Sequence, residues 1–100
     1  MSASEPIVVV AHWKTTADSL ETVLGHLAAL RPQALAEAGC LGYETFQDVD
    51  DASAIVLIER YRDRSALDAH LNSAHYLELV VGRIRPLLTE RRVNFLRETP

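Results

Sequence analysis

Two histidines and two tyrosines between positions 61 and 76 carry side chains that can move a proton. An imidazole side chain is the usual proton carrier near neutral pH, so either His70 or His75 suits a general base. Tyr61 can donate a hydrogen bond to a substrate oxygen, and Tyr76 directly follows His75. Each histidine also has a plain structural role, as a partner of a loop carbonyl or of the adjacent strand. The pattern predicts acid–base catalysis by His70, His75 and Tyr61, with those structural roles as the alternative.

A third histidine lies in an apolar segment near the start of the chain. His12 falls in 7–13, where successive side chains alternate between the two faces of the expected strand. It shares a face with Val8 and Val10, so it points either toward the helices or into the space on the other side of the sheet. In the second case His12 is the strongest acid–base candidate of the three histidines. In the first case it is a core histidine with its hydrogen bonds satisfied.

Glu59 is a candidate functional carboxylate, because it stands on an apolar strand face. Glu59 and Tyr61 are two residues apart and project to the same side. A buried carboxylate is costly unless it is paired, so the alternative role is an ion pair with Arg92 or another basic residue across the sheet or a dimer interface. Aromatic and amide side chains on the other strands can wall a pocket or orient a substrate oxygen. The candidate substrate-binding residues are Tyr43, Phe46, Glu59, Asn94 and Tyr76.

Cofactor motifs are not found in the sequence. No two histidines have the i, i+4 spacing of a helical metal site, and no glycine-rich phosphate loop occurs. Cys40 is the single cysteine, which excludes an internal disulfide, agrees with a reducing compartment and favours an inert buried thiol over a nucleophile. We therefore expect neither a metal nor another cofactor.

Composition predicts one small globular domain. The chain has 100 residues, 48% of them apolar, which suffices for one core over 1–100, with 1–5 expected to be flexible. The net charge is −4 and the basic residues form no run beyond Arg91–Arg92, so nucleic acid is not an expected partner. The apolar stretches are of strand length and the first residues do not resemble an export signal, so no membrane partner and a cytoplasmic location are expected.

The periodicity predicts an α+β fold with the order β-α-β-β-α-β, the ferredoxin-like arrangement of a four-stranded antiparallel sheet. The first helix is expected to follow a cap at Thr15 or Thr16, to kink or break at Pro32 and to end at a left-handed Gly39. The second helical region is expected in two pieces, one capped by Asp63 or Ser65 and one capped by Ser73 and ending before Pro86. Strands are expected at 7–13, 41–47, 54–61 and 90–96.

Two of the strands predict a second copy of the chain. The runs 7–11 and 55–58 are apolar without alternation, so both of their faces need cover, while the helices lie on only one face. Leaving those side chains in water forfeits about 25 cal/mol for each Å² of apolar surface. A homodimer that packs sheet against sheet supplies the missing layer. The alternative is a monomer with a partly apolar open face.

The sequence resembles the antibiotic-biosynthesis monooxygenase family over nearly the whole chain. The matching segments are 37–44 (EAGCLGYE), 59–63 (ERYRD), 66–70 (ALDAH) and 73–76 (SAHY). The resemblance implies a dimeric α/β barrel and a cofactor-free monooxygenase that acts with dioxygen on a phenolic, quinol or polyketide-like aromatic substrate. Such an enzyme supplies a base, a hydrogen-bond donor for the oxyanion and an apolar cavity.

The resemblance also implies alternatives. Haem-degrading relatives require an asparagine, a tryptophan and an axial histidine at positions that here hold His12, Tyr61 and Val80, which disfavours haem. Relatives that isomerise a small phosphorylated sugar share the pattern of His70 and Ser73–Tyr76, although the acidic net charge disfavours an anionic substrate. A dimeric ligand-binding or stress-response module without turnover is the third possibility.

Overall fold

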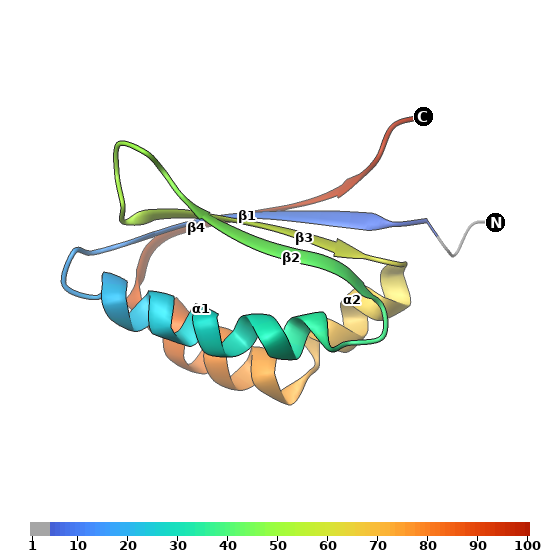
Figure 1. Ribbon diagram of the computed structural model, residues 1–100, viewed down its shortest axis with the longest axis horizontal. Coiled ribbons are helices and arrows are strands. Elements are labelled where there is room, and N and C mark those ends of the chain that lie inside the picture. The colour runs from blue at the N-terminus through green and yellow to red at the C-terminus, as the bar shows by residue number, and fades with distance from the viewer. Residues whose placement is uncertain (1–4) are drawn as a thin grey trace.

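The computed structural model describes residues 5–100. It is an α+β structure in which helices pack on one face of a four-stranded antiparallel sheet (Figure 1). The region expected to be flexible, 1–5, lies outside the described residues except for Glu5. The strands are β1 (Ile7–Thr15), β2 (Cys40–Gln47), β3 (Ala54–Tyr61) and β4 (Leu88–Arg97). The helices are α1 (Leu20–Leu35), α2 (Arg64–Leu71), η1 (Tyr76–Ile84) and η2 (Arg85–Leu87).

The sheet order is β2-β3-β1-β4, so the two central strands are β1 and β3. All of its pairings are antiparallel. This is the ferredoxin-like topology expected from the element order. In the described part of the chain, no helix is both long enough and apolar enough to cross a membrane.

The main core lies between the sheet and the helices. Alternate residues of β1 and β3 face α1 and η1, among them Trp13 and Leu57, which are 5% and 0% exposed. From α1 the side chains at three- and four-residue steps fill the space beneath them, including Val23 and Leu30. This packing fixes the face of the sheet on which a buried site can form.

The second helical region has the two expected pieces. Asp63 caps α2 by accepting a hydrogen bond from the backbone N–H of Ala66, and Ser73 Oγ accepts one from the N–H of Tyr76 at the start of η1. The expectation of an ordinary helix up to Ile84 is wrong in detail, because η1 is a π-helix. Such wide turns are rare and are found most often at functional sites.

The first helix differs from expectation at both ends. It begins at Leu20, and Thr16 Oγ1 accepts a bond from the N–H of Ser19 in the turn before it. The proline at position 32 does not break the helix, which ends at Leu35. A left-handed Gly39 is also wrong, since no described residue has a positive φ. Glycine is needed at position 39 for space, because a Cβ atom there would lie 2.3 Å from the Cβ of Ala66.

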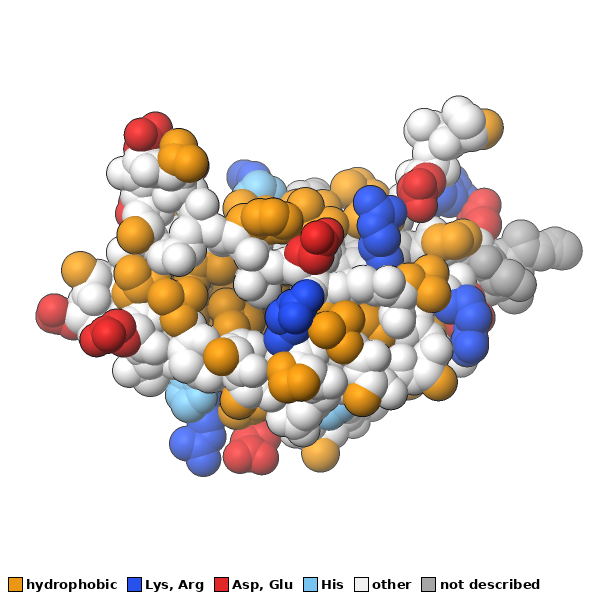
Figure 2. Space-filling model, in the orientation of Figure 1, with side chains coloured by type: hydrophobic (Ala, Val, Ile, Leu, Met, Phe, Trp, Pro, Cys, Tyr) orange, Lys and Arg blue, Asp and Glu red, His pale blue; other side chains and the backbone are white. Residues whose placement is uncertain are grey.

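The other face of the sheet has no covering layer among residues 5–100. Figure 1 shows all helices on one side of the sheet, and Figure 2 shows apolar side chains along the opposite side. The central strands contribute Val10 and Ile58 to this open face, and the outer strands contribute Phe46 and Leu96, which are each 48% exposed. The expected lack of alternation therefore corresponds to a real apolar surface.

Candidate active site

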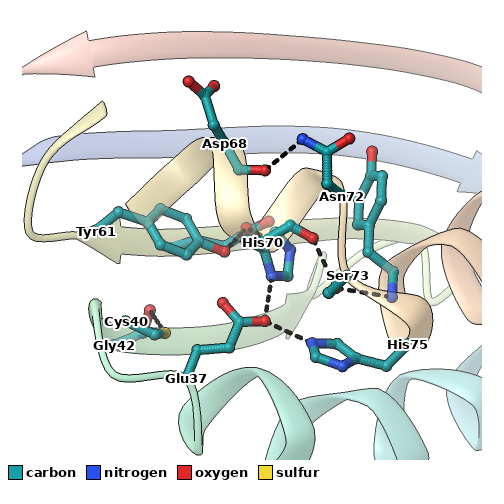
Figure 3. A network of polar contacts seen from close by, with 11 residues as sticks. Glu37, Cys40, Gly42, Tyr61, Asp68, His70, Asn72, Ser73 and His75 are labelled. Carbon is teal, nitrogen blue, oxygen red and sulfur yellow. Dashed lines mark hydrogen bonds and ion pairs between the residues drawn. The ribbon is translucent and has the colours of Figure 1, made fainter. Parts of the chain in front are cut away.

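Glu37 is the centre of a buried polar cluster that joins three segments of the chain. It lies in the turn between α1 and β2, which is held by the bond from the N–H of Cys40 to the carbonyl of Glu37. Its Oε2 atom lies 2.8 Å from Nδ1 of His70 and 2.5 Å from Nε2 of His75 (Figure 3). One carboxylate oxygen thus lies within hydrogen-bond distance of two imidazoles that stand on different helical segments, and the tautomer of each ring sets which atom donates.

His70 is the most buried member of the cluster, with 1% of its surface exposed. Burial lowers its pKa, while the hydrogen bond to Glu37 acts in the opposite direction. Its ring packs against the rings of Tyr61 and Tyr76, with centroids 5.2 Å and 5.1 Å away. The contact with Glu37 and the two neighbouring rings therefore hold the imidazole of His70 in one orientation.

Glu59 extends the cluster into the sheet. Its Oε1 atom accepts a hydrogen bond of 2.6 Å from the hydroxyl of Tyr61 and lies 3.7 Å from Nε2 of His70. Burial raises the pKa of Glu59 from its ordinary value of 4.5 to about 7. The same burial raises the pKa of Tyr61 and of Tyr43, so both phenols stay protonated. The pairing expected with Arg92 is wrong, since Arg92 lies opposite His12 and alternation places it on the other face.

Ser73 fixes the angle between the two histidine-bearing segments. Its hydroxyl donates to the carbonyl of His70 at 2.7 Å and accepts from the N–H of Tyr76 at 3.2 Å. The serine thereby ends α2 and starts η1, which sets His70 and His75 against the same carboxylate (Figure 3). Beyond the serine, the guanidinium of Arg85 donates to the hydroxyl of Tyr76 at 3.0 Å.

A small cavity of about 40 Å³ adjoins the cluster between the sheet and the helices. Glu59 reaches it from β3 and Tyr43 from β2, while Arg91 and Phe95 line it from β4. Trp13 also lines it, and its buried indole N–H has no hydrogen-bond partner in the described structure. This volume is enough for only a few water molecules. A surface groove of about 560 Å³ shares Phe95 with it, so the side chain of Phe95 borders both the cavity and the groove.

The candidate residues from the sequence divide between the two faces of the sheet. Those on the helix side are Tyr43, Glu59, Tyr61, His70, His75 and Tyr76, and the cluster or the cavity includes every one of them. Three others lie on the open face, where they do not reach this site: His12 pairs across the ladder with Val56 and Asn94 with Val10, while Phe46 pairs with Val56. Strand alternation alone could not decide between the faces, because both are apolar near β1 and β3.

Three residues of the site were missed. Glu37 belongs to a turn and shows no periodicity, and its nearest partner is 33 positions away. Trp13 was not among the candidate residues from the sequence, and Arg91 was considered only as part of the short basic pair Arg91–Arg92. Trp13 and Arg91 are cross-strand neighbours on the helix side, a pairing that depends on the register of β1 and β4 and has no signal in the sequence.

Glu37, His70 and His75 also have the ligand types of a metal site, and their donor atoms lie within 4.8 Å of one another. The i, i+4 test could not find such a group, because its members come from three segments. A zinc ion needs bonds of about 2.0–2.2 Å to each nitrogen or oxygen ligand, which separates tetrahedral ligands by more than 3 Å. Here both imidazoles are in direct hydrogen-bond contact with one oxygen. The arrangement is that of a hydrogen-bonded acid–base cluster.

The raised pKa of Glu59 predicts a pH-dependent stability. Between pH 4.5 and 7 the folded protein binds a proton at Glu59 that the unfolded chain does not, so this contribution to stability falls as pH rises through that window. His70 acts in the opposite sense, because its lowered pKa contributes stability that is lost as pH falls below 6.5. The difference in the free energy of unfolding between the wild type and Glu59→Gln reports the contribution of Glu59 alone, because His70 is present in both proteins.

We expect Glu59→Gln to be more stable than the wild type by on the order of 3 kcal/mol above pH 7, and to lose this advantage toward pH 4.5. Urea unfolding at a series of pH values measures the difference. The matched control is Glu78→Gln on η1, where the carboxylate is exposed and lies away from the open face of the sheet. If the stability difference between Glu59→Gln and the wild type does not change with pH, the raised pKa of Glu59 is contradicted.

Comparisons with known proteins agree with the fold and show the family. Residues 6–81 match the family model described as antibiotic biosynthesis monooxygenase. The protein named "Putative monooxygenase Rv0793" from Mycobacterium tuberculosis is 36% identical over 74 residues, which are 74% of this chain and 72% of that protein. Its solved structure has a TM-score of 0.88 and 33% identity, covering 95% of this chain and 96% of the other. The structure of PA3566 from Pseudomonas aeruginosa gives a TM-score of 0.88 and 31% identity over 100% of both chains.

Proposed function

Because this chain belongs to the antibiotic biosynthesis monooxygenase family, we propose that it is a monooxygenase that needs no cofactor and oxidises a phenolic, quinol or polyketide-like aromatic compound with dioxygen. The observation that carries the proposal is the position of Glu59, a buried carboxylate that stands in the wall of a mostly apolar cavity. Such a group can take a proton from a phenol. The resulting anion is electron-rich enough to pass one electron to dioxygen directly.

The cavity wall offers the other groups that this chemistry needs. Arg91 brings a positive charge to the wall, and the free indole N–H of Trp13 is a donor for a substrate oxygen. Aromatic and aliphatic side chains supply the rest of the lining, including Tyr43 and Val80. These surroundings are poor in water, which strengthens the attraction between a phenolate and its donors.

Substrate entry requires a movement, since the cavity is too small for an aromatic ring. Phe95 stands between the cavity and the surface groove and is 55% exposed, so its side chain can swing outward at little cost. The incoming ring then takes over the contacts that Phe95 makes with the cavity. A flat aromatic substrate suits this exchange because it replaces one ring with another.

The proposed enzyme is a homodimer. The open face presents Val10 and Ile58 between the exposed side chains of Phe46 and Leu96, and the part of the chain that the structure describes has no further element to cover them. Contiguous apolar surfaces of this kind usually mark an interface, and a two-fold dimer buries the same patch on both subunits. His12 and Asn94 then belong to the interface and not to the reaction.

An oxygen electrode tests the proposed reaction. Purified protein, treated with a chelator to remove metal ions, is mixed with a panel of substituted hydroquinones. We expect oxygen uptake above the autoxidation rate for at least one of them. Filling the cavity with Val80→Trp, next to Tyr76 and Leu79 on η1, is expected to reduce the uptake by about 100-fold, because the substrate ring loses its place. Leu77→Trp on the exposed side of the same helix is the control. Substrate conversion that continues without oxygen would favour an isomerase, and absence of uptake across the panel would contradict the proposal.

A further inference from the structure

We propose that Glu59 accepts the substrate proton and that His70, Glu37 and His75 carry this proton from the buried cavity to the protein surface. The inference rests on the proposed function, because it requires a phenolic compound that ionises in the cavity. It reassigns the base from the histidines, which the sequence favoured, to a carboxylate. It also gives Glu37 and His75 a role in positioning and moving protons, without contact with the substrate.

Glu59 is the one carboxylate or imidazole among the residues that line the cavity in the described structure. Two other titratable side chains lie next to the Glu59 carboxylate, namely Tyr61 on the same strand and His70 on α2. Three more line the cavity with Glu59, namely Tyr43 on β2, Tyr76 on η1 and Arg91 on β4. Tyr43 and Tyr61 hold their protons because burial raises the pKa of each phenol. The hydroxyl of Tyr76 accepts a bond from Arg85. Glu59 is therefore the group that can exchange a proton near neutral pH.

A base at the bottom of a cavity must lose its proton before the next turnover. Glu59 is 7% exposed and cannot release it to water directly. The cluster supplies a route, since Nε2 of His70 faces Glu59 at 3.7 Å while Nδ1 of the same ring contacts Glu37 at 2.8 Å. From Glu37 the contact to Nε2 of His75 is 2.5 Å. The side chains become more exposed along the route, from 1% for His70 to 17% for Glu37 and His75.

The proton balance is simple because carboxylates and imidazoles alternate. The O–H bond of the phenol breaks and its proton binds Glu59, which leaves the phenolate beside Arg91. Protonated Glu59 passes the proton to Nε2 of His70, which releases its Nδ1 proton to Glu37. His75 takes part as the tautomer that carries its proton on Nδ1, so its Nε2 is free to accept the proton from Glu37, and the Nδ1 proton is then released to water. The first transfer needs the 3.7 Å gap to shorten by about 0.8 Å, to normal hydrogen-bond length.

Two optical signals separate the base from the relay. A nitrophenol absorbs visible light once it is ionised, and a pH-indicator dye reports protons that reach the solvent. Both are followed in a stopped-flow instrument without oxygen and in weak buffer. In the wild type we expect phenolate formation and proton release together. In Glu37→Gln we expect phenolate to form at the wild-type rate and proton release to slow at least about tenfold.

Three further measurements complete the test. In Glu59→Gln we expect no phenolate, which removes both signals. Added imidazole is expected to restore proton release in Glu37→Gln, as a purely structural role of Glu37 would not allow. Glu78→Gln, an exposed carboxylate on η1 that pairs with Arg83, is the control and should behave as the wild type.

The outcomes that overturn the inference are distinct from failure of the proposed function. Unchanged proton release in Glu37→Gln, or slow release that imidazole does not restore, excludes the relay. Phenolate formation in Glu59→Gln excludes Glu59 as the base, and so does a wild type that does not ionise the nitrophenol. Because oxygen is absent, none of these results depends on the monooxygenase reaction, whose failure is seen only in the oxygen-uptake assay.

Discussion

Replacing Ile58 by glutamate is expected to convert the proposed dimer into a folded monomer. In sedimentation velocity at micromolar concentration, the wild type should migrate as a particle of twice the 11.1 kDa chain mass, and Ile58→Glu as a single chain. Ile58 lies on central strand β3 and faces away from the helices. The substitution places two carboxylates in one apolar interface, where each unpaired charge costs several kcal/mol.

A matched substitution elsewhere controls for the added charge. Leu77 on η1 is 50% exposed and Leu96 on the open face is 48% exposed, so the same change to glutamate can be made on both sides of the molecule. We expect Leu96→Glu to weaken the dimer and Leu77→Glu to leave it intact. If Ile58→Glu does not fold, the sedimentation of Leu96→Glu still tests whether the open face forms the dimer interface. A wild-type protein that sediments as an 11.1 kDa particle would contradict the dimer outright.

Adding one methyl group at Gly39 is expected to destabilise the protein by about 2 kcal/mol or more. A Cβ atom at this position would lie 2.3 Å from the Cβ of Ala66 on α2, so the turn or the helix must move. Gly39 follows Glu37 by two residues, and Ala66 precedes His70 by one helical turn. The movement therefore separates the two halves of the polar cluster as well as the two segments.

Urea unfolding of Gly39→Ala measures the loss, and Gly25→Ala is the control. Gly25 lies in α1 with nothing within 4 Å of an added Cβ, so alanine there should raise the free energy of unfolding by about 0.5–1 kcal/mol. The imidazole proton signals of His70 and His75 in NMR spectra should shift in Gly39→Ala and stay in place in Gly25→Ala. Equal stability of the two variants would show that the turn adapts freely.

The order of elements followed from the sequence because hydrophobic period and turn residues are local properties. Asp63 and Ser73 were identified as caps since each precedes a helical pattern and has a short side chain that accepts a backbone N–H. The π-helix at Tyr76–Ile84 was not foreseen, because its sequence fits an ordinary helix equally well. Gly39 was assigned to the correct boundary for the wrong reason, as its cause is a contact with a residue far along the chain.

The site was only half predictable for a similar reason. Glu59, Tyr61 and His70 stood out because a polar group in an apolar pattern requires a partner. That the partner of His70 is Glu37 depends on how the turn after α1 approaches the end of α2, which no periodicity reports. The two apolar faces of β1 and β3 also left His12 undecided, until the helices were seen to cover the other face.

Trp13 is the only tryptophan of the chain, and it stands in the wall of the cavity. The ultraviolet emission of this protein consequently comes from a single indole at the place where a ligand would arrive. Quinones are strong quenchers, so a compound library could be screened by fluorescence alone, before any turnover has been found. Quenching of the Trp13 fluorescence would then report binding in the cavity without any added label.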